Sequence, residues 1–77
     1  MDLRITYDSN ADAAYLYLVG HAERQDAPVF TFEATTPDTA PSFAALDWQN
    51  GRIVGLEVLD ASERLHPDIL AAAERLD

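Results

Sequence analysis

The sequence predicts an α+β fold, with a single antiparallel β-sheet of four to five strands and a C-terminal α-helix packed on one face. Three observations carry this prediction. Apolar and polar residues alternate in residues 3–8 and 28–35, an Asn-Gly pair at 50–51 separates two further strand-like stretches, and the period becomes helical after Asp60. We expect one domain, residues 1–77, with the sheet in 3–59 and a helical segment in 61–76.

The first two predicted strands are residues 3–8 and 13–19. In the first, apolar residues occupy the odd positions from Leu3 to Tyr7, which is the period of a half-buried strand. The second, AAYLYLV, is apolar on both sides, with Tyr15 and Tyr17 on one face. A turn must connect them.

The connecting residues resemble the start of a cation-binding loop. Asp8, Asn10 and Asp12 supply oxygen atoms at alternate positions, as the first three ligands of an EF-type loop do. However, Ala13 stands where such a loop needs glycine, and Val19 stands where it needs a bidentate acid. We therefore interpret 8–12 as a turn that Asp8 closes through its side chain.

The next strands are expected at residues 28–35 and 42–48, separated by a loop that contains two prolines. Phe30 and Phe32 share one side of the earlier strand. Asn50-Gly51 suits a type I′ turn, because both central residues of that turn need positive φ. This turn predicts an antiparallel hairpin between residues 43–48 and Arg52–Leu59.

The helical segment begins after the last strand. Asp60 stands three residues before Glu63, a spacing that suits an N-cap with its capping box. Pro67 suits the first turn of a helix, and the sequence PDILAAAERL follows the helical period. Ile69, Ala73 and Leu76 would then form the stripe that packs on the sheet.

The charge balance excludes several classes of partner. The net charge is −9, and all five basic residues are arginines. Phosphate backbones and anionic membrane surfaces would be repelled, so we expect neither nucleic acid nor membrane as a partner, whereas a basic protein partner is permitted. There is no cysteine and no membrane-length apolar run, and the N-terminus does not read as a signal peptide, so we expect a cytoplasmic protein.

Two stretches resemble a known family. YDSNADAAYLYL, residues 7–18, is similar to a YDxxADALYIxL signature, and NGRIVGLEVLDAS, residues 50–62, is similar to a dGRIVGIEILDAS signature. Together they mark DUF 2283, a family of small uncharacterised bacterial domains. The resemblance implies a β-sheet domain with a terminal helix. It implies no activity and transfers no catalytic residue. Some members are encoded beside small toxin-like proteins, which suggests an antitoxin-like or regulatory role.

Candidate chemistry is sparse. One hypothesis is a small enzyme or a ligand- or cation-binding domain that uses Asp8, Asp12, Glu57 and Asp60, with Glu57 drawing attention because it interrupts an apolar strand. The alternative interpretation makes Glu57 the solvent-facing residue of that strand, or the partner of Arg4 or Arg52 across the sheet. The two histidines, His21 and His66, have no ligand-spaced neighbours. We predict no catalytic, cofactor-binding or metal-binding residue and no cofactor.

The favoured hypothesis is a non-enzymatic protein–protein interaction module that forms a homodimer. One short helix can cover only one face of the sheet, so the other face would expose apolar and tyrosine side chains. The candidate contact residues are Tyr15, Tyr17, Ile53 and Leu59. The contact would use that sheet face or an exposed strand edge.

Overall fold

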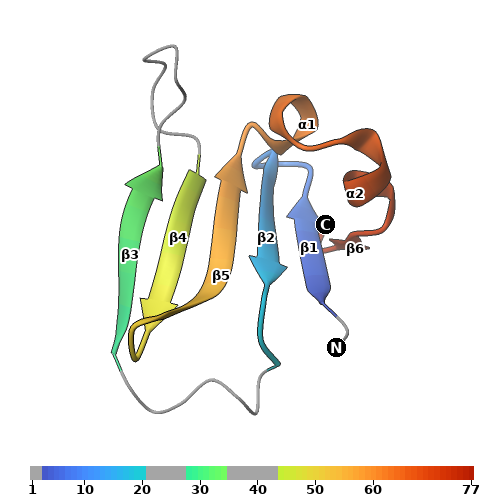
Figure 1. Cartoon of the computed structure of the whole chain (residues 1–77). Coiled ribbons are helices and arrows are strands. Elements are labelled where there is room, and N and C mark those ends of the chain that lie inside the picture. Colours follow the sequence, from blue (N-terminus) through green and yellow to red (C-terminus); the bar gives the residue numbers. More distant parts are fainter. Residues whose placement is uncertain (1–2, 21–27, 35–43) are drawn as a thin grey trace.

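The computed structural model describes residues 3–20, 28–34 and 44–77, which form one sheet and two short helices (Figure 1). The strands are β1 (Arg4–Asp8), β2 (Ala13–Tyr17), β3 (Val29–Ala34), β4 (Ala44–Gln49), β5 (Arg52–Leu59) and β6 (Glu74–Arg75). The helices α1 (Ala61–Arg64) and α2 (Pro67–Ala71) stand between β5 and β6. The α+β class is confirmed.

The sheet is larger and less uniform than the sequence predicts. It has six strands in the order β3-β4-β5-β2-β1-β6. The first four neighbouring pairs are antiparallel, but β6 pairs with β1 in parallel, which makes the sheet mixed. The prediction of four to five antiparallel strands was therefore wrong in both number and direction.

The predicted hairpin is confirmed for its described residues, while Phe43, its first predicted residue, lies outside them. β4 and β5 pair antiparallel on either side of Asn50 and Gly51, whose φ angles are 53° and 74°. Positive φ at both central positions is what a type I′ turn requires. The register shifts by one residue between Asp47 and Trp48, so that Trp48 lies opposite Ile53.

The prediction of a single C-terminal helix was wrong. Two helices of four and five residues replace it, and α2 ends at Ala71. The tail then runs along the open edge of β1, where Leu76 N–H donates to the Tyr7 carbonyl at 3.0 Å. This edge offers backbone partners that a longer helix would leave unused. Leu76, expected on the packed stripe, is 59% exposed.

The core is small and lies where the helices meet the sheet. Ala14, Val58 and Ala61 form its centre, and Tyr7, Leu16, Leu56, Leu65 and Leu70 pack around them. Across the described part of the chain, no hydrophobic residue larger than valine is buried. A core of this kind excludes little water, because most of its members expose part of their side chains.

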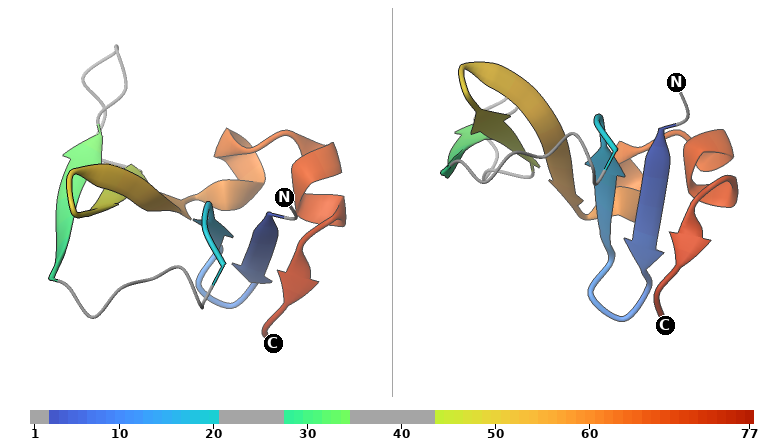
Figure 2. Two further views of the ribbon diagram at one scale, coloured as in Figure 1. Left: turned by 60° about the horizontal axis from the view of Figure 1, so that its bottom comes forward. Right: turned by 90° about the horizontal axis from the view of Figure 1, so that it is seen from below.

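The helices cover only part of the sheet. Both views in Figure 2 place α1 and α2 on the side of β1 and β2, while β3 and β4 lie at the other end of the sheet, away from both helices. Residues that pair across neighbouring strands share a face. The registers therefore separate an apolar face, which the helices partly cover, from a polar face on the opposite side.

Candidate functional site

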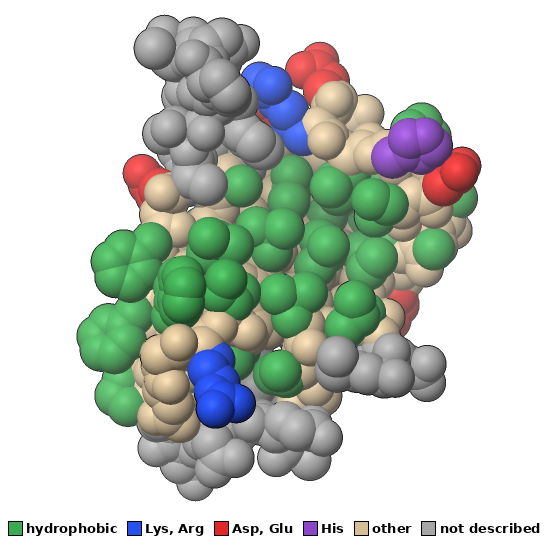
Figure 3. Space-filling model, in the orientation of Figure 1, with side chains coloured by type: hydrophobic (Ala, Val, Ile, Leu, Met, Phe, Trp, Pro, Cys, Tyr) green, Lys and Arg blue, Asp and Glu red, His purple; other side chains and the backbone are tan. Residues whose placement is uncertain are grey.

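The uncovered part of the apolar face is the most extensive candidate site. We call it the open apolar surface, and its side chains come from β3, β4 and β5: Phe30, Phe32, Leu46, Trp48 and Ile53. Phe30 and Phe32 are 58% and 60% exposed, although they are among the largest apolar side chains of the chain. Figure 3 shows hydrophobic side chains gathered over the middle of the sheet, with charged groups at its rim.

All the acidic side chains of β1–β5 lie on the polar face. The strand registers show this directly. Asp8 pairs with Ala13, both Glu33 and Glu57 pair with Ala45, and Asp47 pairs with Thr31 and Gly55. The alternation of the strands thus sends charge to one side and apolar side chains to the other. As a result, the open apolar surface carries no charged residue of these strands, whereas the polar face carries these four acids together with Arg4 and Arg52.

The two tyrosines predicted as contact residues share the polar face. Their rings lie 4.6 Å apart between centroids, and the Arg4 guanidinium lies 5.1 Å from the centre of the Tyr17 ring. The Tyr15 hydroxyl donates to the Asp47 carboxylate, which also accepts from Thr31 Oγ1 at 2.8 Å. These bonds connect β2 to β3 and β4 within the chain. The tyrosines therefore contribute to the cohesion of the sheet.

The other two predicted contact residues lie on opposite sides. The shifted register places Ile53 across from Trp48, on the apolar face, where it is 39% exposed. Leu59 pairs with Ala13 on the polar face and is also exposed. The sequence alone assigns Ile53 and Leu59 to one face, because strict alternation allows no extra residue in β5. The bulge breaks that alternation.

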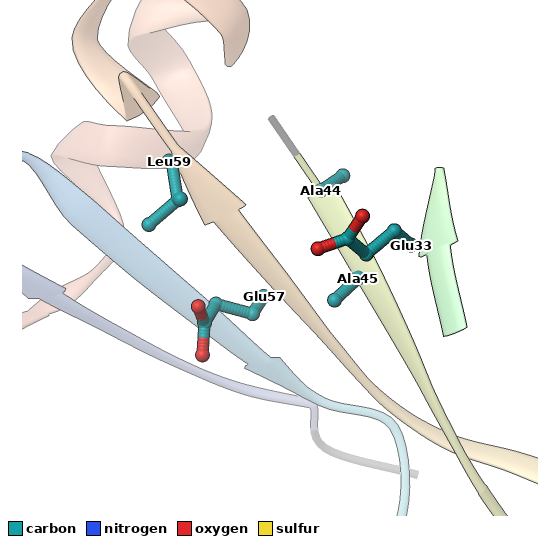
Figure 4. Close-up of a pocket in the computed structure, with 5 residues that line it drawn as sticks. All are labelled: Glu33, Ala44, Ala45, Glu57 and Leu59. Atoms are coloured by element: carbon teal, nitrogen blue, oxygen red, sulfur yellow. The ribbon is translucent and has the colours of Figure 1, made fainter. Parts of the chain in front are cut away.

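A shallow hollow opens on the polar face above Ala45. Glu33, Ala44, Glu57 and Leu59 complete its lining, and it encloses about 300 Å³ including the open space above it. Figure 4 shows Glu33 on β3 and Glu57 on β5, on either side of the small Ala45 side chain. The Glu57 carboxylate turns toward β2 and away from Glu33. The two acids therefore do not converge as an acid–base pair would.

Asp12 has a structural environment that its sequence context does not reveal. Its carboxylate accepts from the Tyr7 hydroxyl at 2.7 Å, from the Ser62 N–H at 3.0 Å and from the Ser62 hydroxyl at 2.7 Å. The bond from Tyr7, followed by those from Ser62, lowers the pKa of Asp12, and the same Asp12 bond raises the pKa of Tyr7. The ionised carboxylate thus joins the β1–β2 turn to the start of α1.

Asp60 does not cap α1 as its spacing predicts. It occupies the N-cap position with φ of 53°, and its side chain makes no capping bond. The free N–H of Ser62 is satisfied instead by Asp12, which does for this helix what an N-cap side chain ordinarily does. The Ala61 N–H also donates to the Asp12 carbonyl, at 3.0 Å. Sequence reasoning missed this connection because it links distant segments.

The remaining predicted ligands are dispersed. The Asp8 carboxylate accepts from the Asn10 N–H at 2.9 Å, which confirms the side-chain turn. His66 Nδ1 accepts from the Asp68 N–H at 3.1 Å and caps α2, while His21 lies outside the described residues. Within residues 3–20, 28–34 and 44–77, no three His, Cys, Asp or Glu side chains gather in a way that could hold a metal ion. Arg4 pairs with Glu74 and not with Glu57.

Comparison with known proteins places the chain in a family. Residues 4–62 match the family described as protein of unknown function (DUF2283). The chain belongs to the DUF2283 family. No curated protein and no solved structure matches it. In addition, neither helix of the described chain has the length and apolar character needed to cross a membrane.

The Asp12–Ser62 contact connects the two stretches of sequence that resemble the DUF2283 family. Asp12 belongs to the first of the two stretches that carry the resemblance, and Ser62 closes the second. The structure brings these stretches together through the bonds of Asp12. The acids at 12 and 60, which the enzyme hypothesis treats as candidate catalysts, stand at this structural joint.

Proposed function

We propose that this DUF2283 domain is a non-enzymatic protein–protein interaction module, and that its contact is the open apolar surface. The observation that carries the proposal is the exposure of Phe30 and Phe32 on a strand whose neighbours on the same face, Leu46 and Trp48, are also apolar. Monomeric proteins rarely expose contiguous apolar patches of this kind, and interaction surfaces commonly do. Aromatic residues are enriched at the centres of such interfaces.

The arrangement of the acids supports the same proposal. Of the four acids in the enzyme hypothesis, Asp8 and Asp12 hold turns and helix ends through their carboxylates. Glu57 is exposed and faces away from Glu33 across the hollow. A reaction that uses paired carboxylates needs them to converge on a common point. The contacts of these residues favour binding over chemistry.

If this domain has an antitoxin-like role, its partner would be a toxin-like protein. A basic partner of this kind would bind the acids of the polar face, where Glu33, Asp47 and Glu57 lie. That role stays secondary in this proposal, because the contacts of the polar face already stabilise the sheet. Neither described helix packs on the open apolar surface.

Site-specific photo-crosslinking in living cells tests the proposed contact. A photoreactive phenylalanine analogue placed at position 32 should give a discrete covalent protein adduct, identified by mass spectrometry. Position 29 provides the matched control, because Val29 is exposed on the same strand but faces the other side. Adducts at neither position, or at position 29 alone, would remove the open apolar surface as the binding site.

A further inference from the structure

Among the described residues, one end of the sheet has no second layer packed on it. Stable domains are built from at least two packed layers around one core. Here α1 and α2 supply the second layer over β1, β2 and the end of β5, while neither helix covers β3 and β4 within the described residues (Figure 2).

The exposed side chains of the described residues locate the missing contact. Phe30, Phe32 and Ile53 on the apolar face are 58%, 60% and 39% exposed. Monomeric proteins rarely leave such neighbouring apolar side chains open to water.

The chemistry of the surface identifies what can cover it. Each strand that contributes to it sends its acids to the opposite face, so the contact is uncharged although the chain carries −9. A basic partner would gain nothing from such a surface. An identical uncharged surface matches it, and two copies can meet there without bringing their acids into contact.

The small core adds a second reason for an identical partner. With no buried hydrophobic residue larger than valine in the described chain, the subunit depends on its partner for much of its apolar burial. A partner on which folding depends must be present wherever the chain is made. A second copy meets that condition by definition.

We propose that two copies of this chain pack their open apolar surfaces face to face around a two-fold axis. This inference rests on the proposed function and names its partner. Facing sheets pack about 10 Å apart, so the aromatic side chains of β3 and β4 in one subunit fill the space left over the sheet of the other. The helices of each subunit lie at the border of the contact and limit it to the uncovered half.

Light scattering coupled to size exclusion, on the purified full-length chain, tests this arrangement. We expect a dimer at micromolar concentration. Phe32→Glu should weaken the dimer on the order of a hundredfold or more, because it buries an unpaired carboxylate in the contact. Val29→Glu adds the same charge to the same strand but on the polar face, and it should leave the dimer intact.

Two measurements on the wild-type chain keep the proposal testable if Phe32→Glu fails to fold. The melting temperature should rise with protein concentration, as it does when subunits stabilise one another. Acrylamide should quench the fluorescence of Trp48, the only tryptophan, more strongly after dilution below the dissociation constant. A melting temperature and a quenching constant that do not depend on concentration would overturn the dimer.

The remaining outcomes separate this inference from the proposed function. A monomer at all concentrations, with Trp48 open to quencher and an apolar dye bound in the wild type but not in Phe32→Glu, overturns self-association and leaves the surface to a different protein. A monomer that shields Trp48 and binds no dye overturns both proposals. A dimer that Val29→Glu disrupts as strongly as Phe32→Glu places the contact at the β3 edge and overturns the face-to-face arrangement.

Discussion

Asp12 and Ser62 lie 50 positions apart, and the side chain of one holds both the hydroxyl and the backbone N–H of the other, at 2.7 and 3.0 Å. The contact joins the turn after β1 to the first turn of α1. It also explains why Asp60 can adopt a left-handed conformation without capping its own helix. The end of the sheet and the start of the helical layer are therefore held together by one carboxylate.

Removing this carboxylate should lower the melting temperature on the order of 5 °C. Asp12→Gly is the suitable variant, because glycine tolerates the φ of 50° at this position and removes only the side chain. The stabilities of the wild type, Asp12→Gly, Ser62→Ala and the double variant, measured by thermal unfolding, form a double-mutant cycle. The double variant should lose less than the sum of the single losses. Strict additivity would show that the contact does not contribute to stability.

The same carboxylate should make stability depend on pH. Hydrogen bonds from Tyr7 and Ser62 lower the pKa of Asp12 in the folded state, so its contribution is complete above the unfolded pKa of about 3.9 and is lost as the pH falls below it. The difference in melting temperature between the wild type and Asp12→Asn should therefore narrow between pH 7 and pH 3. The pKa values of Glu74 and Asp77 are lowered too, but the wild type and Asp12→Asn both contain these residues, so their effect cancels in the difference. A difference that stays constant would contradict this assignment.

Gly51 should be hard to replace by a branched residue. Its φ of 74° disfavours valine, although a Cβ at this position would meet no atom within 4 Å. Gly51→Val should therefore cost about 1 kcal/mol or more through backbone conformation alone. Gly51→Asn is the matched control and should cost less, because asparagine enters this region more readily. Equal losses in urea titrations would mean that contacts of the new side chain, and not φ, dominate.

The sequence predicted the features that local chemistry decides. The hairpin of β4 and β5 follows from Asn50-Gly51 and from the alternation on either side of it. The turn at Asp8 follows from short polar side chains that bond to the nearby backbone. Both depend on residues within a few positions of one another. The family was recognised from stretches of the same local kind, and residues 4–62 confirm it.

The features that the sequence did not predict depend on distant partners. Glu74 and Arg75 become a strand because β1 leaves an edge open beside them, and no residue near them encodes that edge. The predicted contact residues Tyr15 and Tyr17 lie on a central strand, whereas Phe30 and Phe32 are exposed because β3 is at the edge. Strand order is a property of the whole sheet. Alternation identifies which residues share a face, but not which strand lies outermost.

The proposed dimer should respond to salt in a direction that reports on its interface. Two subunits of −9 repel each other at any contact, and raising ionic strength screens that repulsion within a Debye length of about 10 Å at 0.1 M. Because the open apolar surface carries no charged strand residue, no attractive ion pair offsets this effect across the contact. The dissociation constant should therefore fall several-fold between about 50 and about 500 mM sodium chloride, because the Debye length shortens over this range from above about 10 Å to below about 8 Å.

Sedimentation equilibrium at both salt concentrations measures this change directly. Val29→Glu, which adds one further negative charge on the polar face, should form a slightly weaker dimer at low salt and approach the wild type at high salt. A dissociation constant that rises with salt would mean that opposite charges meet across the contact. These charges would come from the arginines and acids of the polar face. The face-to-face arrangement of the apolar surfaces would then be wrong, because the strands contribute no charge to those surfaces.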